Sequence, residues 1–353
     1  MKTKISISNF FTTLTNWEYW PLNVFYSPFV FWYLFLSLRA KSFFFFSNVN
    51  PSMRASGLLG ESKWNIYKLL PTEIYPKTFF INAHAEVNEV IDQFKAAGLN
   101  FPVICKPHLG ERGWWVEKID NEMELQAYIT QFDNDFLLQE YCTLPLEGAV
   151  LYYRFPNEEK GHISSLTFKE MLQIKGDGKS SMQELILAYP RARLQWAVLE
   201  KKYAHQLNTI LPLGEVKILN TIGNHNRGTK FLNFTPQVDD KLIDFFDALC
   251  KKIPDFQFGR FDIKCNSLEE LKEGKNFQVM ELNGVNAEPV HIYQTGFPIL
   301  EAYKVLFTQW NNILKISKQN QLKGNKRLKW NQFWTIFKEV KTYKNPKSEK
   351  FII

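Results

Sequence analysis

The sequence predicts an α+β protein built from two or three lobes of one compact unit. Runs with the two-residue period of strands alternate with runs of helical period along most of the chain. The 353 residues are enough to bury a large core, and 45% hydrophobic with 22% charged residues is typical of a globular protein. The expected order is an aromatic segment with a short α/β N-terminal lobe (1–75), a small α+β lobe (76–142), a large α+β lobe (143–316) and a basic amphipathic tail (317–353).

The positive charge of the chain is concentrated at its C-terminal end. From Lys315 onward there are eleven Lys and Arg against two Glu, a net charge of +9, which leaves −2 for the preceding part of a chain whose total is +7. A nucleic-acid-binding domain carries its basic residues on the binding face of the fold. We therefore expect no nucleic-acid partner.

Cysteine and histidine spacing gives neither a disulfide framework nor a zinc motif. The four cysteines (Cys105, Cys142, Cys250 and Cys265) are far apart with no CxxC pair, and the six histidines show no HExxH. Reduced cysteines are typical of the cytosol. Residues 1–17 lack the apolar core and cleavage site of a signal peptide, so a cytoplasmic protein is expected.

The N-terminal segment contains an uncharged, aromatic stretch at residues 20–38. Its length reaches the lower limit for a membrane span. Two prolines and the aromatic content favour a helix in the membrane interface, ended by Arg39 and Lys41. A helix buried against the N-terminal lobe fits the pattern equally well. The next run, 42–47, has four consecutive Phe and is predicted as a buried strand.

Each further element is predicted by its period or its cap. Ser62 suits the N-cap of a helix that begins at Lys63. Residues 85–97 place apolar side chains at helical spacing and end at Gly98. The same criteria predict helices at 122–132, 182–189, 240–251 and 299–316, and strands at 76–81, 101–107, 114–119, 136–142, 149–155, 163–175 and 216–222.

Two further strands, at 258–265 and from 277 to Asn283, carry the clearest chemical pattern. Alternation puts Arg260 and Asp262 on one face of the first strand, and Glu281 and Asn283 on one face of the second. Carboxylate and amide oxygens are hard ligands that suit Mg²⁺. A salt-bridged sheet surface is the alternative, and it explains Asp262 alone better than it explains the pair of strands.

A second pattern is a strand that ends in Lys106, followed by a turn with Gly110 and Gly113. Glycines let backbone N–H groups approach a ligand closely, and the lysine adds charge, so this hairpin is able to cover phosphates. Glycine hairpins are common, and the pattern alone is weak. No P-loop and no GxGxxG fingerprint follows a strand anywhere in the sequence.

Together these motifs resemble the ATP-grasp superfamily, over residues 61–288. The most specific parts are Val103-Ile-Cys-Lys-Pro107, Gln139-Glu-Tyr141 with Glu147 after it, and Arg260-x-Asp262 with Glu281-x-Asn283. The motif layout is most similar to that of the D-alanine–D-alanine ligases and the wider carboxylate–amine ligases. The resemblance implies two α+β lobes that sandwich ATP, and ATP with Mg²⁺ (or Mn²⁺) as cofactors.

The resemblance also implies roles residue by residue. Lys63 and Lys106 match the lysines that hold ATP phosphates, and the segment from Gly110 through Arg112 to Gly113 matches the phosphate-covering loop. The remaining matches are Glu140, Tyr141 and Cys142 for the adenine hinge, Glu147 for the ribose hydroxyls, Asp262, Glu281 and Asn283 for the metal, and Arg260 for the transferred phosphate.

Weaker candidates lie outside these motifs. Lys179, in the loop Gly176-Asp-Gly-Lys-Ser-Ser181, resembles a loop of several peptide-forming ATP-grasp ligases, and an ordinary helix cap explains it nearly as well. Arg227, with Asn224, is a candidate clamp for the γ-phosphate or acyl phosphate, against a solvated turn. Three residues after the metal strand are candidates for the acceptor pocket, although structural roles are the more common ones for such residues: Glu288, His291 and Tyr293.

The predicted activity is an ATP-dependent ligation of a small-molecule carboxylate to an amine through an acyl phosphate. Phosphotransfer to a hydroxyl and a non-catalytic ATP-binding scaffold are the alternatives. The sequence departs from the D-alanine–D-alanine ligases at Glu111, Arg112 and two following Trp, and in the segment 284–289 after the metal strand. D-Alanine is therefore not the expected substrate.

The C-terminal tail predicts an amphipathic helix with aromatic residues at helical spacing from Trp330 to Tyr343, flanked by lysines. Such a helix suits an anionic membrane surface, and a terminal helix docked on the core is the alternative. Because both ends of the chain are aromatic and basic, we expect peripheral association with the inner face of the membrane.

Overall fold

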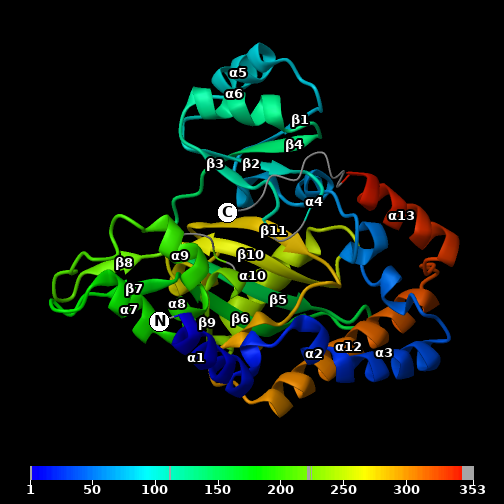
Figure 1. Cartoon of the computed structure of the whole chain (residues 1–353). Coiled ribbons are helices and arrows are strands. Elements are labelled where there is room, and N and C mark those ends of the chain that lie inside the picture. The colour runs from blue at the N-terminus through cyan, green and yellow to red at the C-terminus, as the bar shows by residue number, and fades with distance from the viewer. Residues whose placement is uncertain (1, 111–112, 221–222, 224, 344–353) are drawn as a thin grey trace.

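The computed structural model describes residues 2–110, 113–220, 223 and 225–343. Two large sheets define two lobes, and the smaller lobe stands above the larger one in Figure 1. A two-stranded sheet with its own helices projects from the side of the large lobe. Helices and separate antiparallel sheets make this an α+β protein, which confirms the predicted class.

The small lobe is a four-stranded antiparallel sheet under two helices. The strands are ordered β1 (Thr78–Ile81), β4 (Phe136–Glu140), β2 (Val103–Pro107) and β3 (Glu117–Ile119), and the helices are α5 (Val87–Ala96) and α6 (Glu122–Gln131). Both helices cover the face turned away from the large lobe (Figure 1). Alternation buries Cys105 and Leu138 under the helices and leaves Lys106 and Gln139 on the face toward the large lobe.

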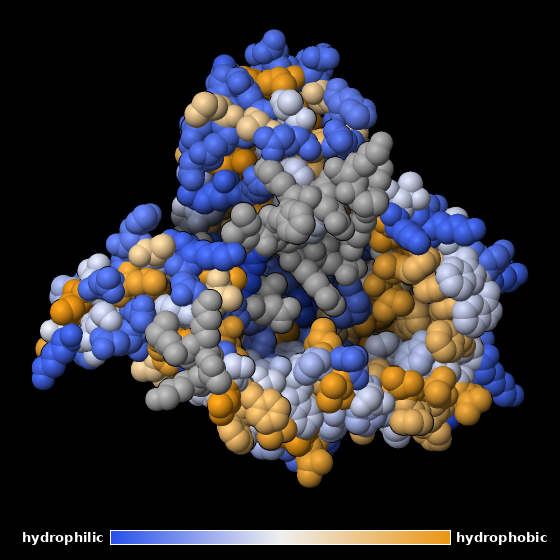
Figure 2. Space-filling model, viewed as in Figure 1, coloured by the Kyte–Doolittle hydropathy of each residue, from blue (hydrophilic) through white to orange (hydrophobic). Residues whose placement is uncertain are grey.

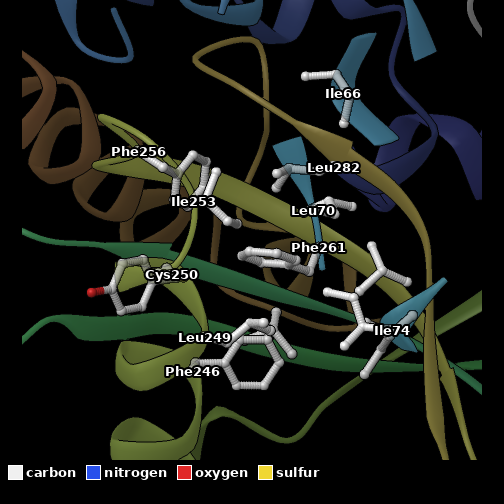
Figure 3. Close-up of a cluster of buried hydrophobic side chains, with 14 of the residues drawn as sticks. Ile66, Leu70, Ile74, Phe246, Leu249, Cys250, Ile253, Phe256, Phe261 and Leu282 are labelled. Carbon is white, nitrogen blue, oxygen red and sulfur yellow. The ribbon is translucent and has the colours of Figure 1, made fainter. Parts of the chain in front are cut away.

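The large lobe is a five-stranded antiparallel sheet. Its strands are ordered β11 (Phe277–Asn283), β10 (Phe258–Cys265), β5 (Leu146–Tyr153), β6 (His162–Glu170) and β9 (Lys230–Asn233). Helix α10 (Asp240–Lys251) has the predicted bounds, and its N-cap Asp239 accepts from the N–H of Leu242 (3.0 Å). Figure 3 shows Phe246 of α10 packed near Phe261 of β10, so this helix covers the core face of the sheet.

Shorter elements complete the two lobes. The side sheet pairs β7 (Gln173–Lys175) with β8 (Val216–Ile218). Three short helices lie beside it: α7 (Met182–Ala188), α8 (Pro190–Leu194) and α9 (Trp196–Lys202). Two further helices are α4 (Lys63–Leu69) and α11 (Leu268–Lys272). Ser62 caps α4 as predicted, through its side chain and the N–H of Asn65 (3.3 Å). Helix α11 lies between β10 and β11, where the sequence suggests only a polar turn.

The N-terminal segment packs along a long C-terminal helix. The helices are α1 (Lys2–Thr15), α2 (Leu22–Phe25), α3 (Ser27–Ala40) and α12 (Ile299–Leu322), which continues past residue 316. Leu36 and Ala40 bury one face of α3, while Phe31 (76% exposed) and Leu38 (78%) lie on the other. The stretch 20–38 is therefore two helices, half buried. Among the described residues, no helix has the length and apolarity needed to cross a membrane.

The predicted strand at 42–47 is wrong. The structure has a 3-10 helix at Phe45–Asn48, and the rings of this segment are buried. Asn48 Nδ2 donates to the backbone oxygen of Ser317 in α12 (3.1 Å), and aromatic contacts reach Trp310 of the same helix. These partners lie about 270 residues away in the sequence, so local hydrophobicity could not distinguish a buried turn from a buried strand.

The predicted tail helix is present as α13 (Trp330–Tyr343), and it is docked on the rest of the chain. Glu339 forms an ion pair with Arg54 of the N-terminal segment. One turn further on, at the last residue of the helix, Tyr343 Oη donates to the backbone oxygen of Asp135 in the small lobe (2.6 Å). Helix α13 therefore connects the N-terminal segment to the small lobe, on the right of Figure 1.

Candidate active site

A cavity of about 360 Å³ opens between the two lobes. Its walls come from β2 and β4 above and from β5, β6, β10 and β11 below, and hydrophilic residues surround the hollow visible between the lobes in Figure 2. Ten of the predicted site residues line it: Lys63, Lys106, Gly110, Gly113, Glu140, Tyr141, Cys142, Glu147, Asp262 and Glu281. Five separate segments of the sequence therefore meet around one cavity.

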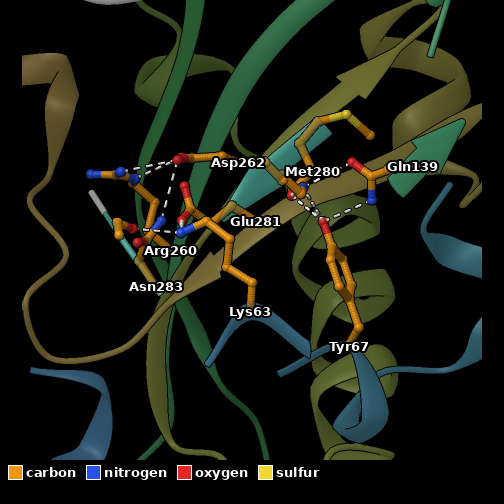
Figure 4. A network of polar contacts seen from close by, with 10 residues as sticks. Lys63, Tyr67, Gln139, Arg260, Asp262, Met280, Glu281 and Asn283 are labelled. Atoms are coloured by element: carbon orange, nitrogen blue, oxygen red, sulfur yellow. Dashed lines mark hydrogen bonds and ion pairs between the residues drawn. The ribbon is translucent and has the colours of Figure 1, made fainter. Parts of the chain in front are cut away.

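The floor of the cavity is the antiparallel pair β10 and β11. Their register places Asp262 opposite Glu281 and Arg260 opposite Asn283, as the alternation in the sequence predicts. Arg260 donates to both oxygens of Asp262 (Nε–Oδ1 2.7 Å, Nη2–Oδ2 3.0 Å), and Asn283 Nδ2 donates to Oδ2 (3.2 Å). Figure 4 shows these four side chains grouped on one side of the strands.

Opposite charges hold Asp262 in its ionised form. Burial alone would raise the pKa of Asp262, but the Arg260 guanidinium and the bond from Asn283 outweigh it and keep that pKa below its ordinary value. Arg260 also donates to the backbone oxygen of Glu288 (Nη1–O 3.3 Å). The guanidinium is therefore fixed in orientation by two segments of the chain.

Lys106 is buried in the upper wall and makes three contacts. Its Nζ donates to Tyr67 Oη (2.8 Å) and Gln139 Oε1 (2.8 Å), and it lies 3.4 Å from the backbone oxygen of Met280. Burial lowers the pKa of Lys106 to about 8, while Glu281 opposes that change. The lysine is mostly protonated at pH 7, so it brings a positive charge to a buried position above the floor.

Lys63 lies at the border between the hairpin and the floor. Its Nζ donates to the backbone oxygen of Gly110 (2.6 Å) and lies 3.4 Å from Glu281 Oε1. The backbone N–H of Lys63 donates to the oxygen of His108 (2.8 Å), which ties the start of α4 to the hairpin. Two lysines from different segments thus flank Glu281 (Figure 4 shows Lys63 beside it).

The opposite end of the cavity is formed where the small lobe connects to the large one. Lys264 donates to the backbone oxygen of Cys142 (3.1 Å) and lies over the Tyr141 ring (5.4 Å to the centroid). Glu147 Oε1 accepts from Lys169 Nζ (2.5 Å). The backbone of this connection and the carboxylate of Glu147 line the cavity, and each is held by a lysine from a strand of the large lobe.

The oxygen donors on the floor are of the chemical type that binds a hard divalent cation. Asp262 and Glu281 are register partners, and Asn283 adjoins them. Mg²⁺ takes few protein oxygens and completes its shell from water and phosphate. Oδ2 of Asp262 accepts from both Arg260 and Asn283, whereas Oδ1 accepts from Arg260 alone and keeps a second lone pair for a cation. Among the described residues no group of three or more His, Cys, Asp or Glu could hold a metal, so the protein would supply two carboxylates and one amide.

Four predicted residues that the structure describes are not among those that line this cavity: Arg260 and Asn283, which bond to Asp262, and Lys179 and Arg227. Lys179 is exposed in the loop before α7, where Asp177 and the capping box of Ser181 account for the local structure. Arg227 is in the 3-10 helix His225–Arg227 and is not among the described residues that line the cavity. Arg112 lies outside the described residues, as do Glu111 and Asn224.

Two of the acceptor-pocket candidates form a cluster beside Arg260. Glu288 accepts from Tyr26 Oη at one oxygen and from Tyr293 Oη at the other (3.0 Å). His291 is buried and bonds to Ser165 Oγ (2.8 Å), and burial lowers its pKa to about 4. His291 therefore has a packing role, whereas Glu288 borders the floor through its backbone.

Sequence reasoning missed several residues that line the cavity or hold Lys106. Lys264 follows Arg260 and Asp262 at the same two-residue spacing, so the strand pattern could have found it. Lys169 is likewise on a strand, and its partner Glu147 was known. Gln139 begins the motif Gln139-Glu-Tyr141, which gave it no role of its own. Tyr67 and Met280 had no signal, because their roles depend on contacts between segments.

No protein family matches the sequence, and neither does any curated protein. Among solved structures, 322 chains match. A bifunctional glutathione synthetase from Pasteurella multocida is 13% identical, with a TM-score of 0.43 over 74% of this chain and 38% of its own. VanG D-Ala:D-Ser ligase from Enterococcus faecalis is 12% identical, with a TM-score of 0.41 over 74% of this chain and 62% of its own.

A D-alanine–D-alanine ligase from Coxiella burnetii is 8% identical, with a TM-score of 0.41 over 82% of this chain and 64% of its own. The chain thus spans less than two thirds of each of these three proteins. At such identities and scores, nothing about the activity of this chain rests on the similarity. The two α+β lobes facing each other across a cavity are those that the ATP-grasp resemblance predicts.

Proposed function

We propose that the protein is an ATP-dependent carboxylate–amine ligase that acts through an acyl phosphate. The observation that supports it most is the meeting of two lysines, Lys63 and Lys106, with the paired carboxylates Asp262 and Glu281 in one cavity between two lobes. Cations above and oxygen donors below form a site suited to a triphosphate with its divalent cation.

ATP lies along the cavity with its adenine at the connection between the lobes. The backbone of Glu140 to Cys142 meets the adenine edge. The carboxylate of Glu147 accepts from the ribose hydroxyls as well as from Lys169. Lys106 and Lys63 neutralise the phosphates. Gly110 and Gly113 bring backbone N–H groups close to them.

Asp262, Glu281 and Asn283 would hold Mg²⁺, which would neutralise charge on the phosphate oxygens. The ion pair with Arg260 keeps Asp262 ionised and therefore ready to act as an oxygen donor. Asp262 and the backbone of Glu288 orient Arg260, and its positive charge stabilises the transferred phosphate. These residues orient and neutralise; none of them forms a covalent bond to the substrate.

The reaction has two steps. A carboxylate oxygen of the first substrate attacks the γ-phosphorus while the bond from that phosphorus to the bridging oxygen breaks, and ADP leaves. The nitrogen of the amine then attacks the acyl carbon, the amine loses a proton, and inorganic phosphate leaves as the amide bond forms. No side-chain nucleophile is required.

The test is ADP release from the full-length protein with ATP, Mg²⁺ and a panel of carboxylates, with hydroxylamine present to trap an acyl phosphate as a hydroxamate. Asp262→Ala and Glu281→Ala should each lower the rate by about 100-fold or more, whereas Glu273→Ala, at an exposed position near β11, should not change it. Full activity of the first two variants would refute the assignment. Phosphate left on a hydroxyl acceptor would show a kinase instead.

We also propose that the protein works at an anionic membrane surface. Apolar residues gather along the lower right of Figure 2, where α3, α12 and α13 lie. Phe31 and Leu38 are exposed on α3, and Trp330 and Trp334 on α13 (56% and 49%). Arg39 lies over the Phe35 ring, and lysines follow the aromatic residues of α13. Aromatic residues with adjacent cations match a membrane interface that carries negative charge.

Flotation with vesicles tests this location. The full-length protein should float with phosphatidylcholine–phosphatidylserine vesicles at low salt and less so at high salt. A double variant, Phe31→Asp with Leu38→Asp, should lose binding, whereas Leu213→Asp, at an equally exposed position on the distant side sheet, should keep it. No flotation of the unaltered protein at low salt would refute the proposal.

A further inference from the structure

A second, smaller cavity of about 60 Å³ adjoins the first, and we refer to it as the side cavity. It lies between the turn 57–61, the edge strand β11 and helix α13. It shares Lys63, Gly110, Met280 and Glu281 with the main cavity. Three of these four belong to the phosphate and cation end in the proposed function, so the side cavity meets ATP at its reactive end and not at the adenine.

Close backbone packing fixes the walls of the side cavity. Gly57 has φ +78°, and a Cβ there would lie 2.7 Å from the Cα of Gly284 at the end of β11. Gly60 has φ +68°, and its Cβ would lie 2.8 Å from Val340 Cγ2 of α13. Any larger residue would push the strand or the helix away. The two glycines therefore let the turn and helix α13 close around a small space.

Glu61 adds a second carboxylate to the side cavity, beside Glu281 and Lys63. Its Oε2 is buried and has no hydrogen-bond partner among the residues that the structure describes. Burial raises the pKa of Glu61 to about 7, although backbone bonds from Arg54 and Ser62 and the charge of Arg54 oppose the change. A buried carboxylate oxygen without a partner is unfavourable, because it loses its hydration and no bond replaces it. A cation in the side cavity would supply a partner for Oε2.

The rest of the lining shows which kind of cation fits. It is mostly apolar, with six aliphatic side chains: Leu58, Leu59, Ile66, Leu109, Leu282 and Val340. Glu281 and Asn283 also line the side cavity, but the proposed function assigns them to the divalent cation of the floor, so Glu61 is the one carboxylate that remains. A primary ammonium on a short carbon chain requires one carboxylate and apolar contacts. The volume corresponds to about four to six water-sized spaces. A small alkylammonium head is therefore the occupant whose size and chemistry match.

We propose that the side cavity is the subsite for the amine substrate, and that the substrate is a primary amine whose ammonium group is held by Glu61. The proposal rests on the ligase function proposed above, because it names the substrate class of that same site. It places the amine next to Lys63 and Glu281, beside the end of ATP where the acyl phosphate forms. Helix α13 forms the outer wall of the subsite through Val340.

Binding of small amines to the full-length protein is the direct test. Ethylamine and glycinamide serve as probes, titrated by ligand-observed saturation-transfer NMR, with neutral acetamide as the uncharged comparison. Glu61→Gln should raise the Kd of both amines at least about tenfold, since bonds between charged partners are the stronger ones. Glu73→Gln, which removes an exposed carboxylate of the same segment, should leave both Kd values unchanged. Equal amine affinity in Glu61→Gln and the unaltered protein would overturn the proposal.

A second variant and a second readout keep the test decisive. Leu59→Trp fills the side cavity and leaves Glu61 in place, so it should also weaken amine binding while the Kd for ATP stays constant. Hydroxamate formation from hydroxylamine reports the acyl-phosphate step alone. If hydroxamate forms but amine binding does not depend on Glu61, only the subsite is overturned. Glu61-dependent amine binding without hydroxamate from any carboxylate would support the subsite and refute the ligase.

Discussion

The free energy of unfolding of the unaltered protein should fall as the pH rises, because Glu61 ionises. In the Glu61→Gln variant this part of the fall should be absent. The pKa of Glu61 is 4.5 when the chain is unfolded and about 7 in the folded protein, because the carboxyl is buried. A group whose pKa is raised by folding contributes full stability below its unfolded pKa and loses that contribution as the pH rises through the folded pKa. The window for the effect is therefore pH 4.5 to about 7.

The size of the effect follows from the two pKa values. At about 1.4 kcal/mol per pKa unit, the upper limit is about 3 kcal/mol. Integration between pH 5 and pH 8 gives about 2.5 kcal/mol lost from the free energy of unfolding. Glutamine carries no titrating proton, so the difference in stability between the unaltered protein and Glu61→Gln should change by this amount across that range.

Urea unfolding followed by tryptophan fluorescence, at several pH values from 5 to 8, measures this difference. Using the difference between two proteins cancels the titration of histidines and other groups that both share. Glu73→Gln, an exposed position, should show a difference that does not depend on pH. A difference for Glu61→Gln that stays constant within about 0.5 kcal/mol over this range would refute the inference that burial raises the pKa of Glu61.

Three further predictions concern other parts of the molecule. Lys106→Met should raise the Kd for ATP at least about tenfold by isothermal titration calorimetry, whereas the exposed Lys95→Met should not; equal values for both would contradict a phosphate role. Asn48→Ala should lower the free energy of unfolding by about 2–4 kcal/mol in urea, because buried bonds to Ser317 are lost and their partners are left unsatisfied; a loss under about 1 kcal/mol would show that these bonds are replaced by water. Asp247→Ala should lower stability by about 1–3 kcal/mol, since Oδ1 of Asp247 accepts from the buried Tyr152 hydroxyl (2.6 Å) and from a backbone N–H, and both donors would lose their partner; an unchanged urea midpoint would contradict this.

The floor of the site could be predicted from the sequence because it depends on local alternation. Asp262 and Arg260 are two residues apart on one strand, as are Glu281 and Asn283 on the other, and the two strands are neighbours in the chain. A two-residue period together with a short connection is sufficient to place such side chains together. The connecting helix α11 did not disturb the register between them.

Residues that act through distant contacts could not be predicted in this way. Strict alternation along β11 would place Met280 and Leu282 on the face opposite to Glu281 and Asn283. The register of β10 and β11 shifts between Asp262 and Ile263, and Met280 lies in the irregularity, where its backbone oxygen accepts from Tyr67 and lies 3.4 Å from Lys106. A bulge of this kind redirects a residue without a signature in the sequence.

The side cavity shows the same limit. Glu61 lies in a glycine-bearing turn that reads as a surface loop, and the cavity that it lines is closed by Val340 of α13, about 280 residues later in the sequence. Lys63 and Lys106 were found because a family resemblance assigned them. Glu61 had no such guide.

The attachment of α13 at both ends has a mechanical consequence for the cavity between the lobes. A helix of 14 residues is a stiff rod about 21 Å long. Its first turn is stacked on Phe44 of the N-terminal segment through Phe333 (ring centroids 4.8 Å apart), and its last residue, Tyr343, donates to Asp135 of the small lobe. The lobes can move apart along this rod only if one of these two contacts breaks or the helix tilts. Helix α13 thus acts as a strut of fixed length between the N-terminal segment and the small lobe, and it limits how far the cavity between the lobes can open.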